Sequence, residues 1–167
     1  MKKVCFLTVL LFSLTVLPVC AQQSLEIEIR NFGIFTLGDS QEIKDEEGKG
    51  TKAAVVSNYK IVNQGDVITA KKGISFGYTY QVFNLPRQQV YTLTHAALIP
   101  PIKTPEGPTI TENNVSFSFK FDDRNQIFFN GFTFDHDYEM VPGKWIFAVV
   151  YNGRVLAKKS FTVVTSP

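Results

Sequence analysis

The amino-acid sequence predicts an all-β fold, an antiparallel β-sandwich of about 7–9 strands. Aromatic residues make up 13% of the chain, and with β-branched residues they fill short apolar runs of the kind that favour strands. Turn residues separate these runs about every 8–12 residues, a spacing typical of sandwich domains. Blocks of good helix-forming residues are missing after the first two dozen residues.

Strand segments follow one another along the whole chain. The first alternates, with Leu25, Ile27 and Ile29 on one face and charged residues on the other, and it continues past a bend at Gly33. Long loops are expected over residues 37–52 and 100–112. We predict strands over residues 24–35, 53–62, 67–70, 74–83, 90–99, 115–121, 127–134, 145–151 and 154–164.

Two of these segments allow sharper predictions. Phe76, Tyr78 and Tyr80 recur at period two, which indicates the core face of a strand rather than a platform for sugar rings. Pro100 and Pro101 offer no amide hydrogen to a neighbouring strand, so we expect them to end the strand over 90–99.

The last two segments form a hairpin. Asn152-Gly153 between two apolar runs is typical of a two-residue turn, because both residues must adopt positive φ. Phe161 and Val163 lie an odd number of residues beyond Leu156, so a regular strand would place them on the opposite face from it. We therefore predict a bulge between Ala157 and Ser160, which leaves Lys158 and Lys159 on a protected edge.

The first 21 residues read as an export signal. Lys2 and Lys3 precede an apolar run, and Val19-Cys20-Ala21 supplies the small residues of a cleavage site after Ala21. Two alternatives are an uncleaved anchor, for which the run is short, and lipidation of Cys20. We predict a signal peptide over 1–21, a single domain over 22–167 and a periplasmic or secreted protein, with a membrane-anchored lipoprotein as the alternative.

Cleavage would change the composition of the protein. Both cysteines, Cys5 and Cys20, lie in the signal, so the mature chain could form neither disulfides nor cysteine-ligated metal centres. The signal also carries two of the 17 basic residues and none of the 15 acidic ones, which leaves the mature domain formally neutral. A neutral domain has no basic surplus that would attract nucleic acid or anionic lipid. We expect no transmembrane span in the mature chain.

Several short motifs stand together in the second half of the chain. They are Phe76-Gly77-Tyr78-Thr79-Tyr80, Ile99-Pro100-Pro101 with Thr104-Pro105, Gly131-Phe132-Thr133-Phe134, Glu139-Met140-Val141-Pro142-Gly143-Lys144-Trp145, and Gly153 to Leu156 with Lys159, Phe161 and Val163. With a looser match at Gly33-Ile34-Phe35, this combination resembles a bacterial exported family of unknown function that has an immunoglobulin-like sandwich. The resemblance implies that fold and an export route, and it assigns no catalytic residue.

The densest polar cluster is Asp135-His136-Asp137-Tyr138-Glu139. In an extended segment Asp135, Asp137 and Glu139 would share one face, where their oxygens could hold Ca²⁺. His136 would point away from both aspartates, so they could not orient it as in a catalytic triad. We expect a solvated approach to the last hairpin, with the three carboxylates as weak metal-ligand candidates.

The second histidine and the remaining chemistry favour binding over catalysis. His95 lies in an apolar strand, where we expect it to anchor the neighbouring proline loop. We predict no cofactor and an exported, non-catalytic module that binds another envelope protein through a sheet edge or a long loop. The alternatives are an envelope hydrolase that uses residues 135–139 and a calcium-stabilised adhesion module. The sequence does not indicate the oligomeric state.

Overall fold

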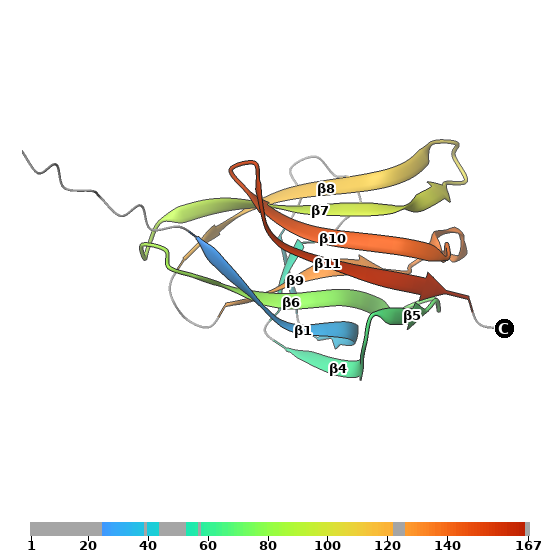
Figure 1. Cartoon of the computed structure of the whole chain (residues 1–167), viewed down its shortest axis with the longest axis horizontal. Coiled ribbons are helices and arrows are strands. Elements are labelled where there is room, and N and C mark those ends of the chain that lie inside the picture. Colours follow the sequence, from blue (N-terminus) through green and yellow to red (C-terminus); the bar gives the residue numbers. More distant parts are fainter. Residues whose placement is uncertain (1–24, 39, 44–52, 57, 122–125, 166–167) are drawn as a thin grey trace, which may run out of the picture.

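The computed structural model describes residues 25–38, 40–43, 53–56, 58–121 and 126–165, and it is a β-sandwich of two sheets (Figure 1). This confirms the all-β prediction. The strands are β1 (Glu26–Leu37), β2 (Ser40–Ile43), β3 (Ala53–Val56), β4 (Tyr59–Gln64), β5 (Val67–Thr69), β6 (Ser75–Phe83), β7 (Val90–Lys103), β8 (Thr109–Lys120), β9 (Ile127–Thr133), β10 (Gly143–Tyr151) and β11 (Arg154–Val164). They exceed the expected number because the segments over 37–52 and 53–62 contribute the short strands β2, β3 and β4.

The strands form two sheets. One sheet has the order β2-β3-β9-β6-β1-β4, and the other has the order β5-β11-β10-β7-β8. Every pair is antiparallel except β5 with β11, which is parallel. The predicted hairpin is confirmed, since β10 pairs with β11. β7 also pairs with the next strand, β8, whereas β1 pairs with the distant β6.

Aromatic side chains fill the space between the sheets. Phe76, Tyr78 and Tyr80 are fully buried, which confirms the core stripe predicted from period two. Phe76 contacts Trp145 edge to face at 5.5 Å between ring centroids. The indole Nε1 of Trp145 donates a hydrogen bond to the Val141 carbonyl at 3.1 Å, so the buried ring leaves no polar atom unpaired.

The two prolines do not end their strand. β7 continues through Pro100 and Pro101 to Lys103, and its register with β8 shifts between Leu98 and Ile102. The prediction of a strand end was wrong because a bulge leaves extra residues outside the hydrogen-bonded ladder, where a missing amide hydrogen costs nothing.

The last hairpin contains the predicted turn and a bulge one position earlier than predicted. Asn152 and Gly153 both adopt positive φ. Val149 pairs with Ala157 and Val150 with Val155, which leaves Leu156 unopposed, while the ladder through 157–163 is regular. The bulge brings Phe161 and Val163 into the core, as expected, and places Ala157 on the inner face instead of Leu156.

No helix in the described part of the chain is long and apolar enough to cross a membrane. The proposed export signal, with its cleavage site and Cys20, lies outside the described residues.

Candidate functional site

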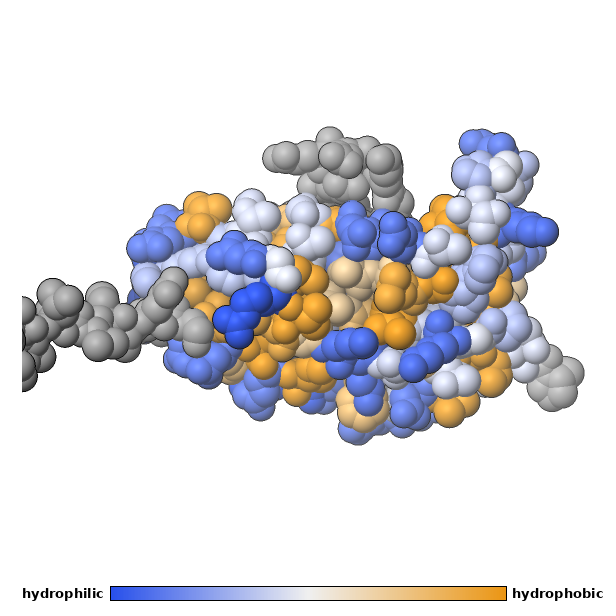
Figure 2. All heavy atoms as spheres, turned by 45° about the horizontal axis from the view of Figure 1, so that its top comes forward, coloured by the Kyte–Doolittle hydropathy of each residue, from blue (hydrophilic) through white to orange (hydrophobic). Residues whose placement is uncertain are grey.

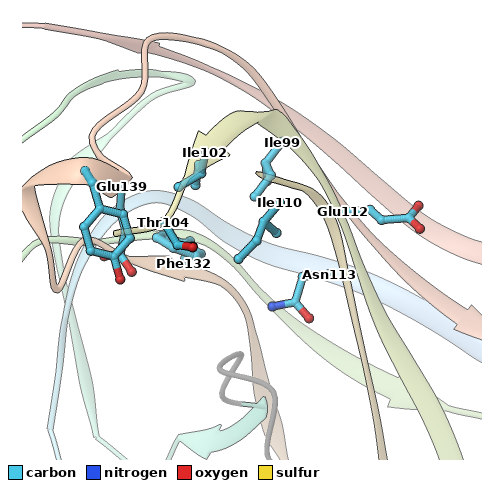
Figure 3. A pocket seen from close by; sticks show the side chains of 9 residues that line it. Ile99, Ile102, Thr104, Ile110, Glu112, Asn113, Phe132 and Glu139 are labelled. Carbon is cyan, nitrogen blue, oxygen red and sulfur yellow. The ribbon is translucent and has the colours of Figure 1, made fainter. Parts of the chain in front are cut away.

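An apolar hollow opens at one end of the sandwich, between the β7–β8 hairpin and β9 (Figure 3). Its volume is about 470 Å³, within the range of pockets that bind small molecules. Figure 2 shows the β7–β8 hairpin projecting from the body at the upper right, with apolar surface beside its base. The lining residues are Ile99, Ile102, Thr104, Ile110, Glu112, Asn113, Phe132, Tyr138 and Glu139.

The hollow lies beside the edge of one sheet. β8 is the last strand of its sheet, and β9 pairs with β3 only through Phe128 and Phe129 in the described part of the chain. The proline bulge then turns Ile99 and Ile102 toward the interior, where both are buried. Ile110, opposite Ile102, remains 38% exposed because no described strand lies beyond it.

A short helical turn closes one wall of the hollow. Residues Asp137–Glu139 form the 3₁₀ helix η1, so the expectation of an extended 135–139 segment was wrong. The physical reason is local capping: Glu139 Oε2 accepts hydrogen bonds from the backbone amides of Asp135 (2.7 Å) and His136 (2.8 Å). The His136 and Tyr138 rings stack at 5.1 Å, which orients Tyr138 beside the hollow.

This capping separates the three carboxylates that were weighed as metal ligands. Glu139 is committed to the backbone, and Asp137 lies 3.9 Å from Lys72 in an exposed ion pair. Within the residues that the structure describes, no three His, Cys, Asp or Glu side chains gather into a set that could hold a metal ion. Asp135, Asp137 and Glu139 are neighbours in sequence without forming a common binding face.

His95 is buried in the core and is not among the residues that line the hollow. Its Nε2 is hydrogen-bonded to the Tyr80 hydroxyl at 2.7 Å, and its ring contacts Phe117 at 4.7 Å between centroids. Burial lowers the pKa of His95 from 6.5 to about 3, because the charged imidazolium would lose its hydration. The interpretation of His95 as a structural anchor holds, but its partner is Tyr80 across the sandwich and not the proline loop.

A second buried polar group was not predicted. Asn130 of β9 lies opposite Tyr78, and its Nδ2 donates to the Tyr78 hydroxyl (3.2 Å) and to the Ala148 carbonyl (2.9 Å). Burial raises the pKa of Tyr78, so this hydroxyl stays neutral. Asn130 and His95 thus tie the sheets together, and neither reaches solvent.

The open edge of β8 runs beside the hollow. β8 is 12 residues long and pairs with β7 alone among the described strands. The other long strand with a partly open edge, β11, is protected: β5 covers residues 162–164, and Lys159 points inward with its Nζ 3.6 Å from the centre of the Phe32 ring. The region therefore combines an apolar hollow with a strand edge that no other described strand pairs with.

Comparison with known proteins gives the family. A domain of unknown function, DUF3859, matches residues 23–163. The chain belongs to the DUF3859 family. An immunoglobulin-like protein from Pseudomonas aeruginosa is similar in structure, with a TM-score of 0.62 and 25% sequence identity over 86% of this chain and 99% of the other. No curated protein matches this DUF3859 chain. The expected family of unknown function with an immunoglobulin-like sandwich is confirmed.

The sequence named the loop over 100–112 as a binding region but not the hollow. Ile99, Phe132 and Tyr138 lie on different elements, and only the folded chain brings them together. The signal in the sequence that could have indicated the hollow is Ile110 in an otherwise polar stretch. The structure shows that this side chain is partly exposed, and exposed apolar side chains often mark contact surfaces.

Proposed function

We propose that this DUF3859 protein is an exported, non-catalytic binding module of the bacterial cell envelope whose partner is another envelope protein. The observation that carries the proposal is the apolar hollow of about 470 Å³ beside the edge of β8 that no other described strand covers. Apolar hollows next to open sheet edges are suited to receive a protein segment, because main-chain hydrogen bonds and side-chain pockets act together.

The chemistry-bearing residues support binding over hydrolysis. A general acid or base must reach its substrate, and His95 is buried behind Phe117 with its Nε2 on Tyr80. The Glu139 carboxylate is already engaged by two backbone amides. The remaining polar lining of the hollow consists of Thr104, Glu112, Asn113 and the Tyr138 hydroxyl, and the Thr104 hydroxyl donates to the Pro108 carbonyl instead of to a general base.

Export is the second part of the proposal, and the order of residues 1–21 supports it: two lysines, an apolar run and Val19-Cys20-Ala21. Mass spectrometry of the protein purified from cell envelopes should give an N-terminus at Gln22 in the soluble fraction. A diacylglyceryl group on Cys20 in the membrane fraction would replace the soluble module by an anchored one.

Photo-crosslinking in intact cells tests the binding function. A photoreactive p-benzoylphenylalanine at Ile110 should form a covalent adduct with one envelope protein, identified by mass spectrometry. The matched control carries the same group at Val155, which is 59% exposed in the β10–β11 hairpin at the other end of the sandwich. Adducts of equal yield at both positions, or none at Ile110, would contradict the binding of an envelope protein at the hollow.

A further inference from the structure

Four strands lie at the edges of the two sheets. They differ in length and in the features that hinder pairing with a further strand. β2 has four residues, β4 has six and β5 has three, whereas β8 has 12. Short edge strands, prolines and charges discourage pairing with a further chain. β8 contains no proline, and Glu112 is its one charge before the terminal Lys120. It is the edge with the least protection in the described part of the molecule.

The register of β8 assigns each of its side chains to a face. Glu112 pairs with Leu98, which is 53% exposed, so Glu112 lies on the outer face. Asn113 pairs with the buried Ala97 and lies on the inner face. Figure 3 agrees: the Glu112 carboxylate points away from the isoleucines, and the Asn113 amide lies below Ile110 at the hollow.

A strand added to β8 would continue this alternation. Its residue opposite Glu112 would point to the outer face, and the residues on either side of it would point inward. These inward positions lie opposite Thr111 and Asn113 of β8, on the side of the apolar hollow that Ile102 and Phe132 line. They therefore select apolar side chains, because burying them there removes apolar surface from water.

Charge selects the residue at the outward position. Glu112 forms no ion pair with the described residues, and the other lining carboxylate, that of Glu139, is held by backbone amides. Oppositely charged residues directly across two strands attract, and like charges repel. The carboxylate of Glu112 thus favours a lysine or arginine in the added strand.

We propose that β8 binds an extended peptide segment of a protein partner by strand addition, with a basic residue opposite Glu112 flanked by two apolar residues that enter the hollow. This inference rests on the proposed binding function and names the chemistry of its partner. The recognition unit is apolar–basic–apolar: Glu112 of β8 faces the basic residue, and the hollow, with Phe132 of β9 in its lining, receives the apolar residues.

The probe is a capped peptide, Gly-Ser-Ile-Lys-Ile-Ser-Thr-Gly, titrated into the ¹⁵N-labelled exported protein and followed by backbone amide chemical shifts. We expect shifts centred on residues 109–114 and binding at least threefold tighter than that of the same peptide with Glu in place of Lys. Glu112→Lys should reverse this preference. Ile110→Asp should weaken both peptides at least fivefold, whereas the matched control Val155→Asp should leave both unchanged.

Backbone methylation separates strand addition from simple side-chain binding. Successive amide groups of a strand point to opposite sides, so methylating the lysine nitrogen or both isoleucine nitrogens must in one case remove the hydrogen bonds to β8. We expect one of the two methylated peptides to lose at least tenfold in affinity. Equal affinity of all three peptides, shifts centred on 26–32 or 154–161, or no shifts at millimolar peptide would overturn the proposal.

The crosslinking experiment tests the binding function and the peptide titration tests strand addition, so the two proposals can be rejected independently. An adduct at Ile110 in cells together with equal binding of the methylated peptides would keep the binding function and reject strand addition. Peptide binding at 109–114 without any adduct at Ile110 would keep the strand-accepting edge and reject the proposed role in the envelope.

Discussion

Acidification should destabilise this fold through His95. In the folded protein its imidazole lies against Tyr80 and Phe117, and burial lowers its pKa to about 3, from 6.5 in the unfolded chain. Below pH 6.5 the His95 side chain therefore binds a proton in the unfolded chain, whereas in the folded chain it becomes protonated only near pH 3. The contribution of neutral His95 to the free energy of unfolding is fully present above pH 6.5 and is lost as the pH falls from 6.5 toward 3.

The size of the effect follows from the two pKa values. Each pH unit in this window is worth about 1.4 kcal/mol, so going from pH 7.5 to pH 4.5 should remove roughly 2.5 kcal/mol through His95 alone. That is a large share of the stability of a typical domain, about 5–15 kcal/mol.

Urea unfolding at several pH values between 7.5 and 4.5 measures this loss. The wild-type protein is compared with His95→Gln, which keeps a hydrogen-bonding group near Tyr80 but cannot be protonated. The difference in the free energy of unfolding between the two proteins should shift by roughly 2.5 kcal/mol across the range. Thr92→Ala, an exposed substitution without an ionisable group on the same strand, is the control and should keep the wild-type pH dependence. A His95→Gln protein whose stability falls with acid as steeply as the wild type would refute the reasoning.

Three further predictions concern metal, packing and the sheet edge. Chelation of Ca²⁺ should leave the melting temperature unchanged, since the carboxylates of residues 135–139 do not form a common site; a shift of several degrees that Asp135→Ala abolishes would contradict this. Gly131→Ala should lower the free energy of unfolding by about 1–3 kcal/mol in urea, because its methyl group would press on the Phe76 carbonyl, whereas Gly65→Ala points into open space and should change it by less than about 0.5 kcal/mol. Lys159→Gln should cost about 0.5–1 kcal/mol in thermal unfolding through the lost contact with the Phe32 ring, and an unchanged midpoint would show that this contact contributes nothing.

The core could be predicted from the sequence because it depends on local alternation. Phe76, Tyr78 and Tyr80 at period two are sufficient to place one buried face, and Asn152-Gly153 is sufficient to place a turn. The family resemblance added the immunoglobulin-like arrangement, which the structure and the comparisons confirm.

The site could not be predicted because it depends on non-local geometry. Whether Pro100 and Pro101 end a strand or form a bulge depends on the neighbouring β8, and the sequence alone does not give that pairing. Glu139 could bind a cation or cap a turn, and the choice follows from the amides of Asp135 and His136 in the folded chain. Similarly, the sequence does not distinguish Asn130 from the other asparagines. Its role as a buried hydrogen-bonding group follows from its place opposite Tyr78 in the folded sheet.

Hydrogen exchange along β8 tests the binding account most directly. Amide exchange should be compared between the isolated protein and the protein held by the partner that crosslinks at Ile110. We predict slower exchange across residues 109–114 in the complex, because an added strand pairs main-chain groups that have no described partner in the free protein, with exchange at 154–161 unchanged. Unchanged exchange at 109–114, or protection that appears at 154–161 instead, would contradict the assignment of β8 as the binding edge.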